Sequence, residues 1–229
     1  MKKVVFAFLL AVALPFASFA QNRVGSFSIT PKAGVCIANI SGSEVLYFDG
    51  VGERTMKSKF NPRITAGVDV EYRVHDYLGI VLGAAYSQQG CRFSNHESKT
   101  TGFSDMVEKM DYINVPLMLR GYIGQGFSVS AGLQMGVLLS DKISYKTSDI
   151  TKYKDGNLVY SEEVKTEQDS KWLRRNTDFS IPVGISYEYK NVIIDARYKF
   201  GLSNLWKDDS FKTEKNKVFD FTVGYRFEL

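Results

Sequence analysis

The two histidines and two cysteines of this sequence are the side chains best suited to acid–base, nucleophilic or metal-ligating chemistry. His75 lies in a short polar segment, and His96 lies between Ser94 and Ser98 beside Glu97. A mechanism with a nucleophile and a base needs two such groups within hydrogen-bonding reach, and a lone loop histidine is far more often solvated than catalytic. The sequence therefore predicts no enzyme active site.

Cys36 and Cys91 leave two interpretations open. In an oxidising compartment they could form a disulfide, although two cysteines do not make a disulfide framework and their spacing fits no metal motif. Two unpaired thiols fit the sequence equally well. No phosphate loop, dinucleotide fingerprint, zinc spacing or calcium loop is present, so we expect no metal and no cofactor. The 29 basic and 25 acidic residues are too evenly balanced, at a net charge of +4, to indicate a nucleic-acid partner.

The other chemically capable residues are acids and bases that alternate with apolar residues. Residues 63–74 carry Ile, Ala, Val, Val, Tyr and Val at one parity and Arg, Thr, Gly, Asp, Glu and Arg at the other. A repeat of two is typical of a β-strand with one apolar and one polar face. Each run is close to the ~9–11 residues that a tilted membrane strand requires. Similar alternation occurs at 27–40, 78–88, 112–122, 127–137, 178–189, 194–203 and 219–229.

These eight runs are joined by connections that are alternately long and short. Short turns on one side of a membrane and long loops on the other are typical of outer-membrane barrels, whereas a soluble sandwich is the main alternative because its strands also alternate. We therefore predict an all-β fold, an eight-stranded antiparallel up-and-down transmembrane β-barrel. An even number of strands places both termini on one side, expected to be the periplasm. The short connections are 75–77, 124–126 and 190–191, and the long ones are 41–61, 90–110, 140–175 and 203–217.

The first twenty residues have the layout of a secretory signal peptide. Two lysines form a basic start, residues 4–16 are almost wholly apolar, and Ser18 and Ala20 offer small side chains at the −3 and −1 positions. The apolar run is shorter than the ~20 residues of a membrane-spanning helix, which argues against an uncleaved anchor. We expect a signal peptide over 1–20, a barrel domain over 21–229, and a location in the outer membrane of a Gram-negative bacterium.

The charged face of each strand is expected to point into the barrel, because an Arg or Lys on the lipid face near the bilayer centre costs about 2–4 kcal/mol. Buried charges must in turn be paired. Side chains just fill the interior of an eight-stranded barrel, so we predict a plugged, polar core without an open pore. The predicted interior charge network consists of Lys32, Asp69, Glu71, Arg73, Arg120, Glu188, Asp195, Arg197, Lys199, Asp220 and Arg226.

Aromatic residues near the strand ends are predicted to form interfacial girdles at the membrane surfaces. Such girdles are routine in outer-membrane barrels, and they explain these residues better than a ligand-binding box does. The predicted girdle residues are Tyr72, Tyr77, Tyr86, Tyr122, Tyr187, Tyr189, Phe200 and Trp206.

The long connection 140–175 contains Asp155-Gly156, a dipeptide that is typical of a hairpin turn. Strand-like residues flank it, so the fifth and sixth strands should continue beyond the membrane as a ribbon. The candidates for contact with a ligand there are Tyr145, Tyr153, Asp155, Gly156 and Tyr160. A merely solvated face is the alternative, because exposed charge is the ordinary state of a surface. The charges concerned are Lys142, Lys146, Lys152, Lys154, Glu162, Glu163, Lys165, Glu167, Lys171, Arg174 and Arg175.

The segment Tyr112-Ile-Asn-Val-Pro-Leu-Met-Leu-Arg120 resembles the Y-x-x-x-P-L-x-x-[KR] strand of a Bacteroidetes outer-membrane β-barrel family, often labelled porin-family proteins. Residues 71–73 (EYR) and 86–90 (YSQQG) are similar to its second hairpin, and 183–189 (VGISYEY) with 196–204 (ARYKFGLSN) to its third. The resemblance covers nearly all of the chain after residue 20. It implies an eight-stranded barrel of the OmpA or OmpX kind. One departure is the final Leu229, where many outer-membrane proteins have phenylalanine.

The expected function is that of a non-enzymatic outer-membrane protein whose long extracellular loops serve envelope integrity, adhesion or partner binding. The expected partners are outer-membrane lipid and a protein or other surface ligand at the loops. Three alternatives are a small-solute porin, which the strand number opposes, a subunit of an envelope secretion machine, and a lipid-modifying enzyme that would depend on His96.

Overall fold

The computed structural model describes residues 24–42, 44–48, 53–93, 96–97, 101–154, 157–160, 163–208, 210 and 213–229. Side chains are described throughout these ranges except at 44–57, 96–97, 101–104, 147–154 and 157–160. The predicted signal peptide and the Asp155-Gly156 turn lie outside the described residues.

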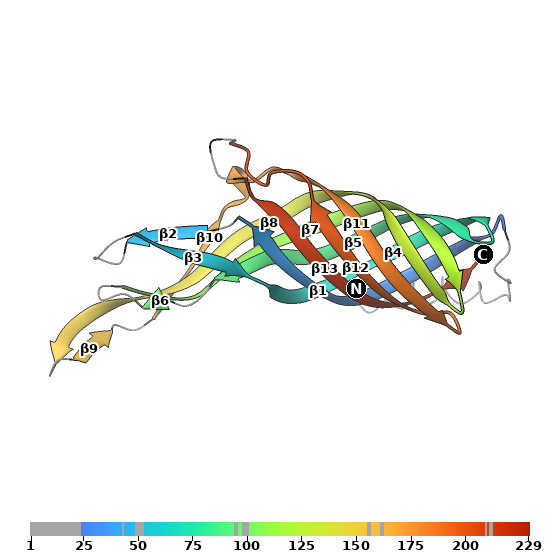
Figure 1. Cartoon of the computed structure of the whole chain (residues 1–229). Coiled ribbons are helices and arrows are strands. Elements are labelled where there is room, and N and C mark those ends of the chain that lie inside the picture. Colours follow the sequence, from blue (N-terminus) through green and yellow to red (C-terminus); the bar gives the residue numbers. More distant parts are fainter. Residues whose placement is uncertain are drawn as a thin grey trace, which may run out of the picture.

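Eight antiparallel strands close into one barrel (Figure 1). Each pairs with its neighbours around the ring, and the first, β1, pairs with the last barrel strand, β13. Closure suits lipid, where no water is present to bond free backbone groups. The predicted fold class is confirmed. The barrel strands are β1 (Phe27–Ser41), β4 (Asn61–His75), β5 (Leu78–Phe93), β7 (Thr101–Gly124), β8 (Phe127–Lys154), β11 (Thr177–Tyr189), β12 (Val192–Gly201) and β13 (Lys215–Tyr225).

The alternation in the sequence produces an apolar outer face and a polar inner face. On β13, Phe219, Phe221 and Val223 are exposed, whereas the intervening Asp220 and Thr222 are buried. A continuous exposed apolar surface of this kind is unusual for a protein in water and suits contact with lipid. In the described part of the chain, no helix is long and apolar enough to cross a membrane.

Tight turns join the strands at one end of the barrel, here called the short-turn end. Lys190 and Asn191 have φ values of 48° and 68°, the positive values that a type I′ hairpin turn requires at both central residues. Gln125 and Gly126 also have positive φ, 52° and 85°. Both turns fall within predicted short connections, and the opposite end of the barrel is called the long-loop end.

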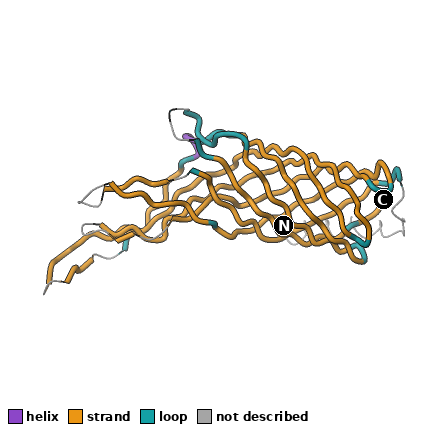
Figure 2. The backbone as a smooth tube through the Cα atoms, in the orientation of Figure 1, coloured by secondary structure: helices purple, strands orange, loops and turns teal. Residues whose placement is uncertain are grey.

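At the long-loop end, β7 and β8 run far past the barrel (Figures 1 and 2). β8 has 28 residues and would be about 90 Å long at ~3.3 Å per residue. There it pairs with β7 at one edge and with β9 (Asn157–Tyr160) and β10 (Val164–Asp169) at the other. The predicted ribbon is confirmed for these residues. One expectation is wrong: residues 101–110 are not a loop but the start of β7, because they pair with β8.

The smaller elements complete the two ends. β2 (Glu44–Phe48) and β3 (Glu53–Lys59) form a hairpin at the long-loop end, and β3 also pairs with β5. β6 (His96–Glu97) pairs with β7, and the short 3-10 helix η2 (Lys171–Leu173) follows β10. At the short-turn end, β14 (Phe227–Glu228) pairs with the start of β1.

Candidate functional site

The largest group of functional side chains is a network of charges in the middle of the barrel, and Asp69 is its hub. Its Oδ2 lies 2.7 Å from Lys32 Nζ, 2.6 Å from Arg197 Nη2 and 4.0 Å from Arg120 Nη2. Asp69 is only 3% exposed. Because β1, β4, β7 and β12 each direct one of these residues inward, the network connects strands all around the ring.

Glu71 continues the network toward the short-turn end. Its Oε2 lies 2.7 Å from Arg120 Nη1 and 3.3 Å from Arg226 Nη2, and the Tyr122 hydroxyl donates to its Oε1. Arg226 Nε also lies 3.2 Å from Glu188 Oε2. A single chain of contacts thus runs from Lys32 to the end of the barrel, and we call it the central network. Its members are Lys32, Asp69, Glu71, Arg120, Glu188, Asp195, Arg197 and Arg226.

Within this network Arg197 also holds Asp195, with Nε 2.6 Å from Oδ1, and the Ser186 hydroxyl donates to Asp195 Oδ2 at 2.7 Å. The guanidinium of Arg73 lies 3.5 Å from the Tyr122 ring centroid. Lys199 and Asp220 form a separate pair at 2.5 Å. The structure therefore brings nearly all of the predicted interior charges into contact with a charge of opposite sign.

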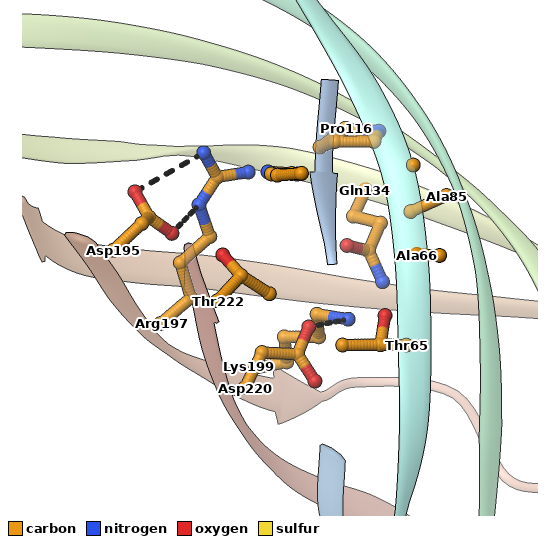
Figure 3. A pocket seen from close by; sticks show the side chains of 12 residues that line it. Thr65, Ala66, Ala85, Pro116, Gln134, Asp195, Arg197, Lys199, Asp220 and Thr222 are labelled. Carbon is orange, nitrogen blue, oxygen red and sulfur yellow. Dashed lines mark hydrogen bonds and ion pairs between the residues drawn. The ribbon is translucent and has the colours of Figure 1, made fainter. Parts of the chain in front are cut away.

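Two spaces between these side chains are described, and both are small. One cavity of about 20 Å³ is bordered by Arg197, Lys199, Asp220, Thr222 and Gln134 (Figure 3). A second, of about 10 Å³, lies against Asp69 and Arg120. A cavity needs roughly 10–15 Å³ to hold one water molecule. At these two places the interior has room for about one water each, and not for a passing solute.

A second group of buried charges lies at the long-loop end around Arg174. Its Nη1 lies 2.6 Å from Glu214 Oε2, its Nε lies 3.3 Å from Asp141 Oδ2, and its Nη2 donates to Glu108. The indole of Trp206 stacks on the guanidinium, with the ring centroid 3.7 Å from Cζ. Arg174 is 2% exposed and Asp141 is fully buried. We call Glu108, Asp141, Arg174 and Glu214 the rim cluster.

Main-chain hydrogen bonds hold the loop segments that carry the rim cluster. Ser170 N donates to Asp141 O at 3.1 Å, Arg175 N to Leu205 O at 2.8 Å, and Leu205 N to Glu214 O at 2.9 Å. The sequence interpretation of Arg174 as part of a solvated face is therefore wrong. No alternating pattern marks residues 170–176, so the sequence carries no signal that this arginine folds back into the barrel mouth.

An apolar cluster lies beside the rim cluster. The thiol of Cys91 donates a hydrogen bond to Glu108 Oε2 at 3.7 Å. Both cysteines are buried, and neither forms a disulfide. The prediction of a polar core is therefore wrong at the long-loop end, where inward-facing positions of β1, β5, β7 and β8 carry apolar side chains. The cluster consists of Ile40, Cys91, Phe93, Met110, Tyr112, Leu138 and Leu205.

The rim cluster contains three carboxyl groups for one guanidinium. The pKa of Glu108 is raised to about 7, because burial raises it, the Arg174 guanidinium lowers it, and the neighbouring Asp141 and Glu214 raise it again. Burial also raises the pKa of Asp141, again against Arg174. These groups lie beyond Leu139, the last exposed apolar residue of β8 before Asp141. The cluster is therefore a place where the folded protein retains a proton close to neutral pH.

The predicted aromatic girdle is present in part. Tyr72, Tyr77, Tyr187 and Tyr189 are exposed near the short-turn end, Phe200 is exposed near the long-loop end, and Tyr86 is half-buried on the outer face. Two positions are wrong, because the barrel interior offers them charged partners. Tyr122 bonds Glu71 and stacks on Arg73, and Trp206 stacks on Arg174.

The predicted ligand contacts of the ribbon lie mostly outside the described side chains. Tyr145 is half-buried, and Tyr153 and Tyr160 have described backbones on β8 and β9. Asp155 and Gly156 lie outside the described residues. Some ribbon charges pair across strands: Lys142 Nζ lies 2.8 Å from Glu167, and Lys146 Nζ lies 2.8 Å from Asp105 and 3.2 Å from Glu163.

The histidines form no constellation in the described structure. His75 accepts a long hydrogen bond from Tyr77 N at 3.4 Å at the exposed short-turn end, and only the backbone of His96 is described. Among the described residues, no three His, Cys, Asp or Glu side chains are grouped as a metal site would require.

A family model described as an outer membrane protein beta-barrel domain matches residues 19–207. No curated protein matches the sequence. Among solved structures, Ail of Yersinia pestis is 16% identical with a TM-score of 0.44, covering 90% of this chain and 100% of its own. OprG of Pseudomonas aeruginosa is 14% identical with a TM-score of 0.42, covering 91% and 99%. The Escherichia coli outer membrane protease OmpT is 8% identical with a TM-score of 0.34, covering 93% and 100%. Likenesses this distant carry no conclusion about activity.

Proposed function

We propose that this chain, which belongs to the outer membrane protein beta-barrel domain family, is a non-enzymatic surface protein that closes its own interior and presents a protruding sheet outside the cell. Residues 1–20 would be removed as a signal peptide, and 21–229 would form the barrel domain. The short-turn end and both termini would face the periplasm, because outer-membrane barrels have short periplasmic turns and long outer loops. The expected partners are outer-membrane lipid and a protein or other ligand at the sheet.

The filled interior is the observation that carries this proposal. Asp69 and Glu71 each contact at least two cations, and the apolar cluster and the rim cluster occupy the long-loop end. Two cavities among the described interior charges measure about 20 and 10 Å³. Opening a path would expose buried charges and break pairs, each break costing about 3–5 kcal/mol. A small-solute pore is therefore the weaker interpretation.

The protruding sheet is the part of the molecule available to a partner. β10 pairs with β8 at one edge, and no described strand pairs with its other edge. An unpaired strand edge offers backbone donors and acceptors in a row, and extended segments of partner proteins bind such edges by adding a strand. The exposed side chains of β10 are mixed in charge, which suits a protein surface better than a uniformly charged polymer.

Conductance and surface labelling test the proposal together. The purified barrel in a planar bilayer should show no steady open channel, and a steady channel of high conductance would contradict it. In intact cells, a membrane-impermeant maleimide should label Lys165→Cys on β10 but not Lys190→Cys in a short turn. The reverse pattern would contradict the orientation, and the native cysteines give little background because both are buried.

A ribbon deletion tests the sheet itself. Tyr145 and Thr166 are register partners on β8 and β10, so replacing 146–165 with Asn-Gly should close a shorter hairpin without disturbing the barrel. Proteins that co-purify with the intact chain from outer membranes should be lost with this variant. If the same partners were retained, the binding surface would lie elsewhere.

A further inference from the structure

Like charges face one another on the outer surface of the long-loop end. Lys59 of β3 is the register partner of Arg92 of β5, and Lys109 of β7 is the register partner of Lys142 of β8. Side chains directly opposite each other in a sheet are about 5 Å apart at Cβ, and like charges there are destabilising. An anion bound beside two such pairs would offset this repulsion.

The two pairs lie on adjoining strands, because β3 pairs with β5, β5 with β7 and β7 with β8. Arg92 is opposite Val107, and Gly90 is opposite Lys109, so Arg92 and Lys109 are diagonal neighbours at roughly 7–8 Å. The positions between them, Cys91 and Glu108, are buried inside the barrel. The four cations therefore project from the outer face of four adjoining strands, β3, β5, β7 and β8.

Most of this charge is not neutralised by the described protein. Lys142 has a carboxylate, Glu167, at 2.8 Å. Among the described residues, Lys59, Arg92 and Lys109 form no ion pair, although Lys109 lies close enough to the Glu167 carboxylate to help lower its pKa. The interior charges are paired far more completely. We call Lys59, Arg92 and Lys109 the basic ledge.

The height of the ledge is that of a membrane interface. Tyr86 and Ile113 are opposite each other above the exposed apolar rows of β5 and β7, and Lys109 lies four residues beyond Ile113. At ~3.3 Å per residue and a tilt of about 45°, Lys109 is roughly 9 Å above that apolar pair. The headgroup layer occupies about 5–8 Å beyond the hydrocarbon core, and long basic side chains bend toward it.

The other end of the barrel is different. Aromatic pairs mark it, Phe127 with Tyr187 at 4.7 Å and Tyr225 with Phe227 at 4.9 Å between ring centroids. Rings of this kind suit an interface without strong charge preference. Aromatic residues mark both interfaces, since the Tyr198 and Phe200 rings pair at 4.5 Å near the long-loop end. What distinguishes the long-loop end is its group of outward-facing basic residues, which suits an anionic leaflet.

From these observations we propose that the basic ledge binds phosphate groups of lipids in the outer leaflet. The proposal rests on the proposed orientation, with the long-loop end outward. Lys215 and Lys217 of β13 also face outward just beyond Phe219, but their register partners Ser41 and Asn39 are uncharged. They lack the like-charge repulsion and should contribute less.

The test uses residues 21–229 in phosphatidylcholine nanodiscs that contain bis-phosphorylated lipid A, with bound lipid counted by native mass spectrometry. Arg92→Gln with Lys109→Gln should weaken lipid A binding roughly 30-fold, because each basic residue near an anionic surface contributes about five-fold. Lys165→Gln with Lys190→Gln removes the same charge elsewhere and should leave binding unchanged. Lys215→Gln with Lys217→Gln should have a smaller effect than the ledge variant.

Three further arms keep the outcome decisive. Arg92→Lys with Lys109→Arg should retain binding, which separates charge from folding. Dephosphorylated lipid A should bind no better to the wild type than to the ledge variant, and inorganic phosphate should not compete. Equal binding by ledge and control variants, or displacement by inorganic phosphate at the same concentration as the lipid, would overturn the proposal. Nanodiscs offer lipid to both ends, so this failure would leave the display function and its labelling test intact.

Discussion

The central network and the rim cluster are both buried, but their charges balance differently. The central network sets four cations against four carboxylates: Lys32, Arg120, Arg197 and Arg226 against Asp69, Glu71, Asp195 and Glu188. The rim cluster sets the single guanidinium of Arg174 against three carboxylates. The central network is neutral with all of its carboxyl groups ionised. The rim cluster approaches neutrality only when some of its carboxyl groups keep their protons.

The difference follows from where the residues lie. The central residues occupy inward positions of regular strands, so the fold fixes them and cross-strand neighbours supply their partners. The rim residues come from the extensions of β7 and β8 and from the segments beside η2 and β13. These converge only when the loops fold back over the barrel mouth. The central network should therefore behave as a rigid part of the barrel, and the rim cluster as a closure that responds to pH.

The largest effect is expected from Arg174→Met. It leaves Glu108, Asp141 and Glu214 buried without their cation, and breaking a buried pair in this way costs about 3–5 kcal/mol. Urea unfolding followed by tryptophan fluorescence, to which Trp206 beside Arg174 contributes, should show a loss of about 4 kcal/mol in the free energy of unfolding. Lys165→Met, on the exposed β10, is the control and should be close to neutral.

Acidic pH should reduce the cost of losing Arg174, because protonated carboxyl groups need no cation. The loss at pH 5 should therefore be smaller than the loss at pH 8. A loss that was the same at both pH values would show that packing of the arginine, and not its charge, closes the barrel mouth.

A somewhat smaller effect is expected from Asp69→Asn, about 3 kcal/mol. Arg197 would keep Asp195 and Arg120 would keep Glu71, but Lys32 would lose its carboxylate. Replacing both members of the separate pair, Lys199→Met with Asp220→Leu, is the matched control, since removing a whole buried pair is often close to neutral. If the double variant were the more damaging, the central network would not be acting through its charge balance.

The pH dependence of the rim cluster gives the next effect. The pKa of Glu108 is raised to about 7 in the folded protein, above the ~4.3 of an unfolded chain. The folded state thus binds this proton more tightly. The stability it contributes is complete below about pH 4 and is lost as the pH rises through about 7.

The wild type should lose about 2 kcal/mol of stability between pH 5 and pH 8 relative to Glu108→Gln, which cannot ionise. Unfolding in urea at a series of pH values measures the difference. Parallel curves for the two proteins would show that Glu108 does not titrate in this range, and the contrast with the central network would then fail.

Periodicity made the barrel and the central network predictable. Asp69 and Arg197 lie within alternating strands, where apolar neighbours facing lipid oblige them to face inward. The rim cluster could not be predicted, because Arg174 is one of many charges in a segment without a repeat, and only the folded loops select it. The length of β7 was missed for a related reason: outside the membrane, strand pairing rather than an apolar face holds residues 101–110.

The reactivity of the two cysteines measures local opening in the two regions directly. This is the smallest effect that we expect. Cys91 contacts the rim cluster through Glu108, whereas Cys36 is packed with Ala38 and Val218. Both are buried, so a maleimide can react only after local opening. If proton loss from Glu108 loosens the rim, the ratio of Cys91 to Cys36 labelling should rise above pH 7. Single-thiol variants Cys36→Ala and Cys91→Ala measure each rate. The ratio is used because the thiolate fraction changes with pH at both sites. A ratio that stayed constant with pH would mean that the two regions open together and that the barrel mouth has no independent response to pH.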